Sequence, residues 1–374
     1  MQILIMLIGL ALIFIILWDA FETVVLPRRI TRQWRLTSMF YRLTWSPWSA
    51  VARKKSERDR ENFLGLYGPL SLLLLLGVWA IGLIFGFGLL HWGASFSSGE
   101  EASLIHYLYF SGTNFFTLGL GDVVPLTPLG RIITVGEAGT GFAFLGLVVA
   151  YVPLLYQAFS RREVNISLLD ARAGSPPSAI ELLQRFCQVT QSTHLDSFFA
   201  DWERWSAEVL ESHMSYPVLG YFRSQHENES WLAALTMVLD ASALVIATFD
   251  GATGQAANLT FAMARHAAVD LSQVYATPPH VPMRDRLRPA ELALAQNLFA
   301  TRHQRINVDR LMELRRLYEP YVNALADYLL MPLPTWSEAP NVSDNWQITA
   351  WSQVDGIALE RPISIPEPAS SIEK

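Results

Sequence analysis

At 374 residues, with 51% hydrophobic side chains and a formal net charge of −6, the chain is long enough for a membrane portion and a soluble one. Residues 1–159 contain nearly all of the long apolar runs, whereas residues 160–374 hold 17 basic and 25 acidic side chains. This surplus of acids argues against a nucleic-acid partner. The single cysteine, Cys187, excludes an intrachain disulfide and suits a reducing compartment.

The first apolar segment, residues 1–26, is predicted to be an N-terminal transmembrane helix. Residues 1–18 are apolar apart from Gln2, which is close to the roughly 20 residues needed to cross a bilayer. A cleaved signal peptide has a basic start and a small-residue cleavage site. Neither occurs before Asp19, so we expect the helix to be retained.

Residues 27–62 form a basic segment that we expect to lie in the cytoplasm. The segment carries ten Arg or Lys and three acidic residues, and the positive-inside rule places such a loop on the cytoplasmic side. Interleaved aromatic residues favour an amphipathic segment in the headgroup layer. They are Trp34, Phe40, Tyr41, Trp45 and Trp48. The alternative is a loop that only sets the orientation of the chain.

A pore domain is predicted over residues 63–159. Residues 64–90 form an uncharged apolar run that is long enough to span as an outer helix. The following stretch, up to Ser103, has acidic but no basic residues, which places it and the N-terminus outside. Residues 103–116 are too short to span and stop at a glycine-rich loop, as a re-entrant pore helix does. Residues 129–159 form the last apolar helix, the inner helix.

The loop over residues 117–122 reads TLGLGD. Its two glycines, Gly119 and Gly121, allow backbone angles that other residues resist, so successive carbonyls can face the same side. Four such loops around one axis would replace the hydration shell of a K⁺ ion. We expect the ion at the backbone carbonyls, with no structural metal and no cofactor. The residues expected to bind it are Thr117, Leu118, Gly119, Leu120 and Gly121, with the Thr117 hydroxyl at the inner end.

TLGLGD resembles the TVGYGD filter of tetrameric potassium channels and, with leucine for tyrosine, the second filter of some two-pore-domain channels. Arg131 and Gly141 stand where that family carries a helix-start basic residue and an inner-helix hinge glycine. The family's tyrosine and the hydroxyl before its filter threonine are replaced by Leu120 and Phe116. Over about residues 64–158, the resemblance implies an all-α membrane protein with a potassium-channel-like pore module and homotetrameric assembly.

Three residues are predicted to support the filter. Asp122 follows the loop directly, and Glu137 lies in the apolar inner helix, where an ionisable group is costly and by default functional. Related channels place an acid behind the filter on the pore helix, and Thr113 occupies the comparable position here. We therefore expect Glu137 to supply that acid, hydrogen-bonded to Thr113 or to filter backbone. The alternative is a glutamate that reaches solvent near the outer helix end.

Two inner-helix residues are candidates for a hinge or gate. The resemblance assigns the hinge to Gly141. Pro153 lacks an N–H and its ring clashes with the preceding turn, so we expect it to bend the helix near the inner mouth of the pore. A kink without any gating role is the alternative.

Residues 160–332 are predicted to form a cytoplasmic helical domain, followed by an irregular, proline-rich tail over 333–374. The chain shows no strand–glycine-rich loop–helix unit, which disfavours a doubly wound nucleotide-binding domain. The apolar segment over residues 231–249 could be read as a fourth span. Asp240 lies in the middle of it, where a bilayer would penalise the charge, so we favour a buried bundle helix.

Histidines and carboxylates gather in the sequence between residues 211 and 229, but their spacing matches neither a zinc nor a calcium motif. We expect structural or capping roles for Glu211, His213, His226, Glu227 and Glu229. No nucleophile–base, phosphate-loop or paired-carboxylate pattern is visible, which predicts a protein that is not an enzyme.

The sequence therefore predicts a potassium-selective, pore-forming homotetramer in the plasma or inner membrane, in contact with lipids and regulated by its helical domain through a ligand that the sequence does not identify. The alternatives are a weakly selective cation channel, or a membrane-anchored sensor or scaffold with a vestigial pore loop.

Overall fold

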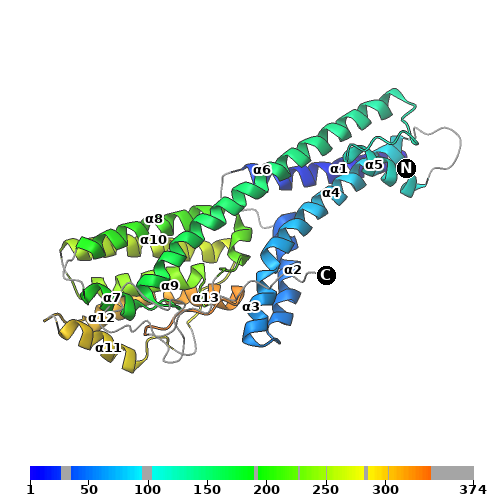
Figure 1. Ribbon diagram of the computed structural model, residues 1–374. Coiled ribbons are helices and arrows are strands. Elements are labelled where there is room, and N and C mark those ends of the chain that lie inside the picture. Colours follow the sequence, from blue (N-terminus) through cyan, green and yellow to red (C-terminus); the bar gives the residue numbers. More distant parts are fainter. Residues whose placement is uncertain are drawn as a thin grey trace, which may run out of the picture.

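The computed structural model describes residues 1–26, 35–94, 103–188, 193–225, 228–249, 251–281, 285–301 and 303–337. Every regular element within these ranges is a helix, which confirms the expected all-α membrane protein. The molecule is elongated, with a membrane arm at one end and a helical bundle at the other (Figure 1). The start of the basic segment, the residues His226 and Glu227, and the tail beyond 337 lie outside the described residues.

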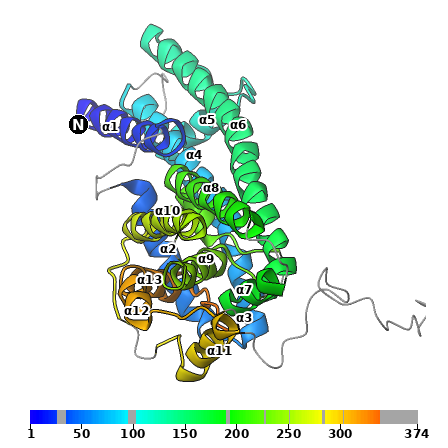
Figure 2. The ribbon, with the colours of Figure 1, turned by 90° about the vertical axis from the view of Figure 1, so that its left-hand side faces the viewer.

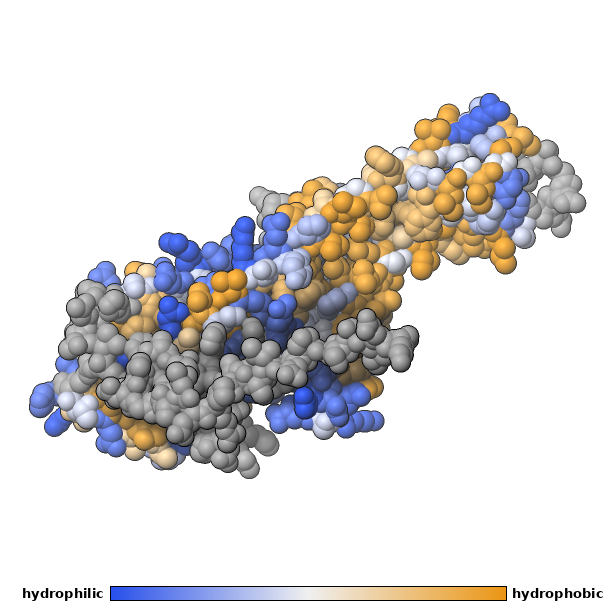
Figure 3. Space-filling view, in the orientation of Figure 1, coloured by the Kyte–Doolittle hydropathy of each residue, from blue (hydrophilic) through white to orange (hydrophobic). Residues whose placement is uncertain are grey.

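The membrane arm consists of α1 (Gln2–Ala20), the π-helical turn η1 (Phe21–Val25), α4 (Tyr67–Ala94), α5 (Leu104–Phe115) and the first part of α6 (Pro128–Ala173). Three helical stretches are long and apolar enough to cross a membrane, namely Gln2–Val25, Glu57–Ala94 and Pro128–Ala173. Apolar side chains cover this arm, and hydrophilic ones are frequent over the bundle (Figure 3).

The inner helix is longer than the sequence predicts, because α6 continues past residue 159 as far as Ala173. Arg161 and Arg162 therefore lie within this helix, where its side chains change from mainly apolar to mainly polar. The helix stops at Gly174, whose φ of 81° suits glycine, and prolines follow at 176 and 177. One unbroken helix thus joins the membrane arm to the bundle.

Small residues let α1 pack closely on α4. A Cβ atom on Gly9 would lie 2.6 Å from the carbonyl oxygen of Gly86, so neither position has room for a side chain where the helices cross. At the end of α1, the buried carboxylate of Asp19 accepts hydrogen bonds from Trp79 Nε1 at 3.0 Å and from Thr37 Oγ1 at 2.6 Å. The first span is therefore fixed to the pore module by both packing and hydrogen bonds.

Helices α2 (Leu36–Ala52) and α3 (Glu57–Gly65) lie beside the bundle, at the inner end of the arm (Figure 1). Tyr41 stacks on Tyr221 with ring centroids 5.5 Å apart, and Trp45 donates to the carbonyl of Tyr328 at 3.1 Å. Both side chains are buried. These two aromatics, which the sequence places in the headgroup layer, pack on protein instead, because large rings suit a helix–helix junction as well as a membrane surface.

The bundle contains α7 (Ala179–Gln188), α8 (Thr193–Ser215), the 3₁₀ turn η2 (Pro217–Tyr221), α9 (Trp231–Ile246), α10 (Ala252–Val274), α11 (Pro289–Ala300), α12 (Val308–Arg316) and α13 (Glu319–Leu329). Helix α9 lies at its centre (Figure 2), and every residue from Trp231 to Val245 is buried. Asp240 is neutralised there by Arg286, whose Nη1 and Nη2 atoms lie 3.0 and 2.9 Å from its two carboxylate oxygens. The prediction of a buried bundle helix is confirmed.

Candidate functional site: the loop between α5 and α6

Helix α5 is held against the outer helix α4 and directs its carboxyl end at the loop. Ser111 Oγ lies 2.7 Å from the carbonyl oxygen of Ile84, and Tyr107, Phe110 and Phe115 are buried. The helix ends at Phe115, and the next residue but one, Thr117, has a positive φ of 57°. A short helix that packs on a span and stops at an irregular loop has the form expected of a re-entrant segment.

Positive φ angles recur at every second residue of the loop, at Thr117 (57°), Gly119 (54°) and Gly121 (78°). Alternation of this kind places successive peptide carbonyls on one side of the chain and the N–H groups on the other. The amides of Leu118 and Gly119 donate to the carbonyl of Thr113 at 2.7 and 3.4 Å. The amides of these two residues therefore face the end of α5.

The loop is exposed in the single chain, from Phe116 to Asp122. Its apolar side chains are far from buried, since Leu118 and Leu120 are each 62% exposed. Ile132 and Val135 near the start of α6 are exposed as well. Large apolar side chains that are exposed in a single chain often contact another protein or lipid.

Asp122 ties the outer end of the loop back to α5. Its Oδ2 atom accepts a hydrogen bond from the Tyr109 hydroxyl at 2.8 Å, and its Oδ1 atom accepts from the amide of Val123 at 3.1 Å. The sequence predicts that Asp122 supports the loop. It does not predict a role for Tyr109, because nothing in the pattern of α5 distinguishes one aromatic residue from its neighbours.

Glu137 is wholly buried behind the loop, but its partners are not those that the sequence predicts. Its Oε1 atom accepts from Ser111 Oγ, and its Oε2 atom lies 2.8 Å from His91 Nε2. Thr113 instead donates its hydroxyl to the carbonyl of Phe110 at 2.8 Å. The prediction of a Glu137–Thr113 contact is wrong because Ser111 presents its hydroxyl toward α6. The alternative of a solvent-exposed glutamate is also excluded.

Gly141 lies where α6 crosses the end of α5. A Cβ atom on it would lie 1.9 Å from the carbonyl oxygen of Phe115, which is closer than any real contact. The glycine is thus required for packing next to the loop. Its role as a hinge stays a prediction. Pro153 lies within the continuous helix α6, and its role as a gate stays a prediction.

His213, which the sequence groups with nearby carboxylates, packs in the bundle next to the inner helix. Its Nδ1 atom donates to the carbonyl of Val209 at 2.8 Å, and its Nε2 atom accepts from Arg162 Nη1 at 3.2 Å. Burial and the adjacent guanidinium lower the pKa of His213 to about 3. In the part of the chain that the structure describes, no group of three or more His, Cys, Asp or Glu could hold a metal ion.

Comparisons with known proteins agree with this geometry. Residues 72–156 match the family Ion_trans_2, described as an ion channel. Over 122 residues, 33% of this chain and 39% of the relative, the chain is 30% identical to a voltage-gated potassium channel of Aeropyrum pernix. Over 201 residues, 52% of this chain and 58% of the relative, it is 24% identical to YdjJ, an uncharacterised membrane protein of Bacillus subtilis. No solved structure matches the chain.

The chain spans less than two thirds of the length of both relatives. The matched stretch contains most of α4, all of α5, the loop and the first part of α6, so it coincides with the site described above. These findings support a membrane protein that contains an ion-channel domain. Residues 72–156 are thus similar to an ion-channel family, and the resemblance of this chain to the pore-loop potassium channel family is confirmed.

Proposed function

We propose that four copies of this chain form a potassium-selective pore, in which each copy contributes the loop from Thr117 to Asp122. The observation that supports this most directly is the alternation of positive φ at residues 117, 119 and 121. With the amides of the loop directed at Thr113, the carbonyls are free to replace the water around a dehydrated K⁺ ion.

Fourfold assembly follows from the geometry of such a filter, because each chain supplies one loop and a ring of carbonyls needs four. Copies related by a closed rotation present the same pair of surfaces to each neighbour. The exposed apolar residues of the loop and of α6 are the surface that these neighbours cover. Native mass spectrometry after gentle extraction tests this assembly, with four subunits as the expected mass and a stable monomer or dimer as the result against it.

In the proposed topology, α2, α3 and the bundle lie on the cytoplasmic side and the N-terminus lies outside, which the basic residues of the segment over 27–62 support through the positive-inside rule. The bundle then regulates the pore through α6, which enters both parts without a break. Deletion of residues 175–374 is expected to change open probability or assembly and to leave ion selectivity unchanged. A truncated chain that opens like the full-length protein would leave the bundle without a regulatory part.

Conduction is tested by uptake of radiolabelled rubidium into liposomes that contain the purified protein. Gly119→Ala is expected to abolish uptake, because a Cβ atom strains the positive φ at this position. The matched control is Gly77→Ala in α4, where a Cβ atom meets nothing within 4 Å and the backbone is helical. Equal uptake by the two variants would refute the assignment of the loop as the filter.

A further inference from the structure

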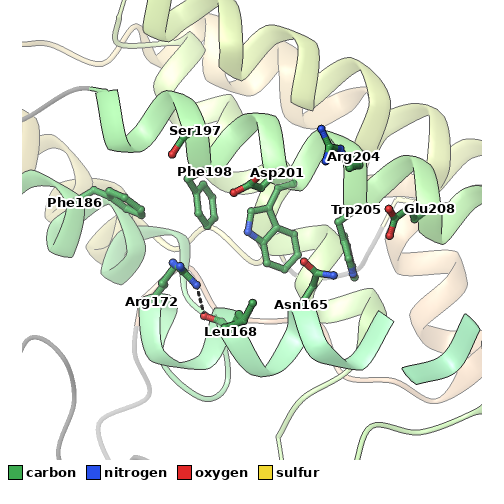
Figure 4. Close-up of a pocket in the computed structure, with 11 residues that line it drawn as sticks. Asn165, Leu168, Arg172, Phe186, Ser197, Phe198, Asp201, Arg204, Trp205 and Glu208 are labelled. Atoms are coloured by element: carbon green, nitrogen blue, oxygen red, sulfur yellow. Dashed lines mark hydrogen bonds between the residues drawn. The ribbon is translucent and has the colours of Figure 1, made fainter. Parts of the chain in front are cut away.

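A cavity of about 620 Å³ lies between the end of α6 and helices α7 and α8 (Figure 4). Small-molecule sites in proteins usually have volumes of about 300–1,000 Å³, apolar walls and a few polar groups. The cavity borders α6, the helix that also enters the membrane arm. The residues that line the cavity therefore indicate which kind of ligand the bundle binds.

One wall of the cavity is aromatic and comes from α8. Phe198, Trp202 and Trp205 follow at intervals of four and three residues, so they occupy one face of the helix. The ring centroids of Phe198 and Trp202 are 5.8 Å apart, and those of Trp202 and Trp205 are 4.7 Å apart. The rings are inclined to one another by 37° and 60°, so the wall offers both faces and edges to an aromatic ligand.

Charged side chains lie on both sides of the cavity, with Arg172 on α6 and Asp201, Arg204 and Glu208 on α8. Arg172 extends from α6, and Asp201 extends from α8, both next to the ring of Phe198 (Figure 4). Arg172 donates to the carbonyl of Leu168 at 2.9 Å through Nη1 only. No ion pair within the described part of the chain involves Arg172 or Asp201, and they do not pair with each other. A guanidinium and a carboxylate are thus both available to a ligand.

We infer that this cavity is a binding site for a small aromatic molecule that carries both an anionic group and an N–H donor. The planar guanidinium of Arg172 suits a carboxylate or a phosphate group. The carboxylate of Asp201 accepts from an amine or a ring N–H. The ring of the ligand then lies against Phe198 and Trp202. Aromatic amino acids and aminopurine monophosphates share this chemistry.

A ligand in the cavity would hold the end of α6 to α8. Helix α8 is itself fixed in the bundle, where Thr260 of α10 donates to the carbonyl of Phe199 at 2.7 Å. On the α6 side, Arg172 belongs to the helix that also contains Glu137 and Gly141. The ligand shifts the pore between states only if it binds them with unequal affinity. This coupling rests on the proposed function, whereas the binding itself does not.

Binding is measured by isothermal titration calorimetry on the full-length protein in nanodiscs, with L-tryptophan and adenosine monophosphate as separate probes. We expect saturable binding of at least one of them, and the probe that binds identifies the carboxylate or the phosphate as the preferred anion. Adenosine, which lacks the anion, and inorganic phosphate, which lacks the ring, are expected to bind about tenfold more weakly or not at all. Binding by neither probe would overturn the inference.

Two matched pairs of variants locate the site. Arg172→Gln is expected to weaken binding by about tenfold or more, because it removes a charge-assisted contact, while Arg161→Gln, an exposed arginine of α6 outside the cavity, leaves binding unchanged. Asp201→Ala is expected to weaken binding, and Glu211→Ala, an exposed acid farther along α8, is not. Equal affinities within both pairs would place the ligand elsewhere and overturn the inference.

The effect on the pore is read separately as ligand-dependent rubidium uptake. Uptake that changes with the probe in the native protein, and not in Arg172→Gln, is the result expected from the coupling through α6. Binding that depends on Arg172 in a protein with no rubidium uptake under any condition would refute the proposed channel function and leave the binding site in place.

Discussion

The Oε2 atom of Glu137 lies 2.8 Å from the Nε2 atom of His91, and both side chains are completely buried between α4 and α6. The other carboxylate oxygen accepts from Ser111 of α5. One acidic side chain thus connects the outer helix, the pore helix and the inner helix directly behind the loop. Ionisable groups inside a membrane are costly. A buried carboxyl group that contacts α4 and α5 from α6 is best explained by a role in holding these three helices together.

Glu137→Ala is expected to destabilise the loop, because it leaves the buried groups of Ser111 and His91 without this partner. Each lost hydrogen bond costs about 0.5–1.5 kcal/mol, and more where one of the groups is charged. The variant should therefore inactivate faster and lose its native assembly at a lower temperature. Glu137→Gln keeps an oxygen for Ser111 and should retain conduction. Wild-type conduction and kinetics of Glu137→Ala across pH would show that the acid does not brace the loop.

A double-mutant cycle distinguishes the observed partner of Glu137 from the one that the sequence predicts. Ser111→Ala and Glu137→Ala should be coupled by about 0.5–3 kcal/mol in thermal stability, as groups in contact are. Thr113→Val removes a hydroxyl that contacts only the Phe110 carbonyl, so its effect should add to that of Glu137→Ala. Coupling to Thr113 and additivity with Ser111 would be the opposite of what the contacts imply.

Gly141→Ala is expected to lower the stability of the assembled protein and to reduce the current. The added Cβ atom overlaps the Phe115 carbonyl, and overpacking of this kind costs about 1–3 kcal/mol or more. Gly139→Ala is the control, since a Cβ atom there meets nothing within 4 Å in the single chain. If Gly141 served only as a hinge, its alanine variant would alter gating kinetics and leave the melting temperature of the assembly unchanged.

His213 predicts a loss of stability in acid. Burial first, and the charge of Arg162 second, lower its pKa from 6.5 to about 3 in the folded chain. The unfolded chain therefore binds more protons between these two values, and the free energy of unfolding falls as the pH is lowered through this window. Thermal melts from pH 7 to pH 4 should show a shallower decline for His213→Gln than for His266→Gln, an exposed control. Parallel declines in the two variants would contradict the assignment.

Glu229 predicts a pH dependence of the opposite sign. Burial, with the nearby acids Asp170 and Glu163, raises its pKa from 4.5 to about 8. The folded chain then binds more protons than the unfolded chain between these values, so the free energy of unfolding falls as the pH rises through them. Glu229→Gln should remove this decline and raise the melting temperature at pH 8.5 relative to Glu211→Gln. The difference in melting temperature between Glu229→Gln and Glu211→Gln should therefore be larger at pH 8.5 than at pH 5. An equal difference at the two pH values would contradict the raised pKa of Glu229.

The sequence predicts the local geometry of the pore module well, and the reasons are physical. Gly119 and Gly121 are conspicuous between two apolar runs, and a loop that needs positive φ at alternate residues selects glycine. The charge of Asp240 within an apolar segment likewise indicates a protein interior and not a bilayer. Both inferences depend on single residues, each of which would cost a large amount of free energy in the wrong environment.

The sequence does not predict contacts between segments that are far apart in the chain. The pairing of Glu137 with His91 and Ser111 depends on how far α6 is rotated about its axis, and a serine and a threonine two residues apart in α5 are equally plausible partners from sequence alone. In the same way, Tyr41 and Trp45 carry no signal that separates a protein junction from a lipid surface. Helix rotation and tertiary contact decide both cases.

The central claim, that the loop from Thr117 to Asp122 selects K⁺ through its backbone, is tested most directly by the reversal potential of the reconstituted protein in a K⁺/Na⁺ gradient. For the native chain, we expect a reversal potential near the equilibrium potential of K⁺. Leu120→Tyr should keep or sharpen this value, because the side chain at 120 only braces the carbonyls. A reversal potential near zero would contradict the claim and favour a weakly selective cation channel.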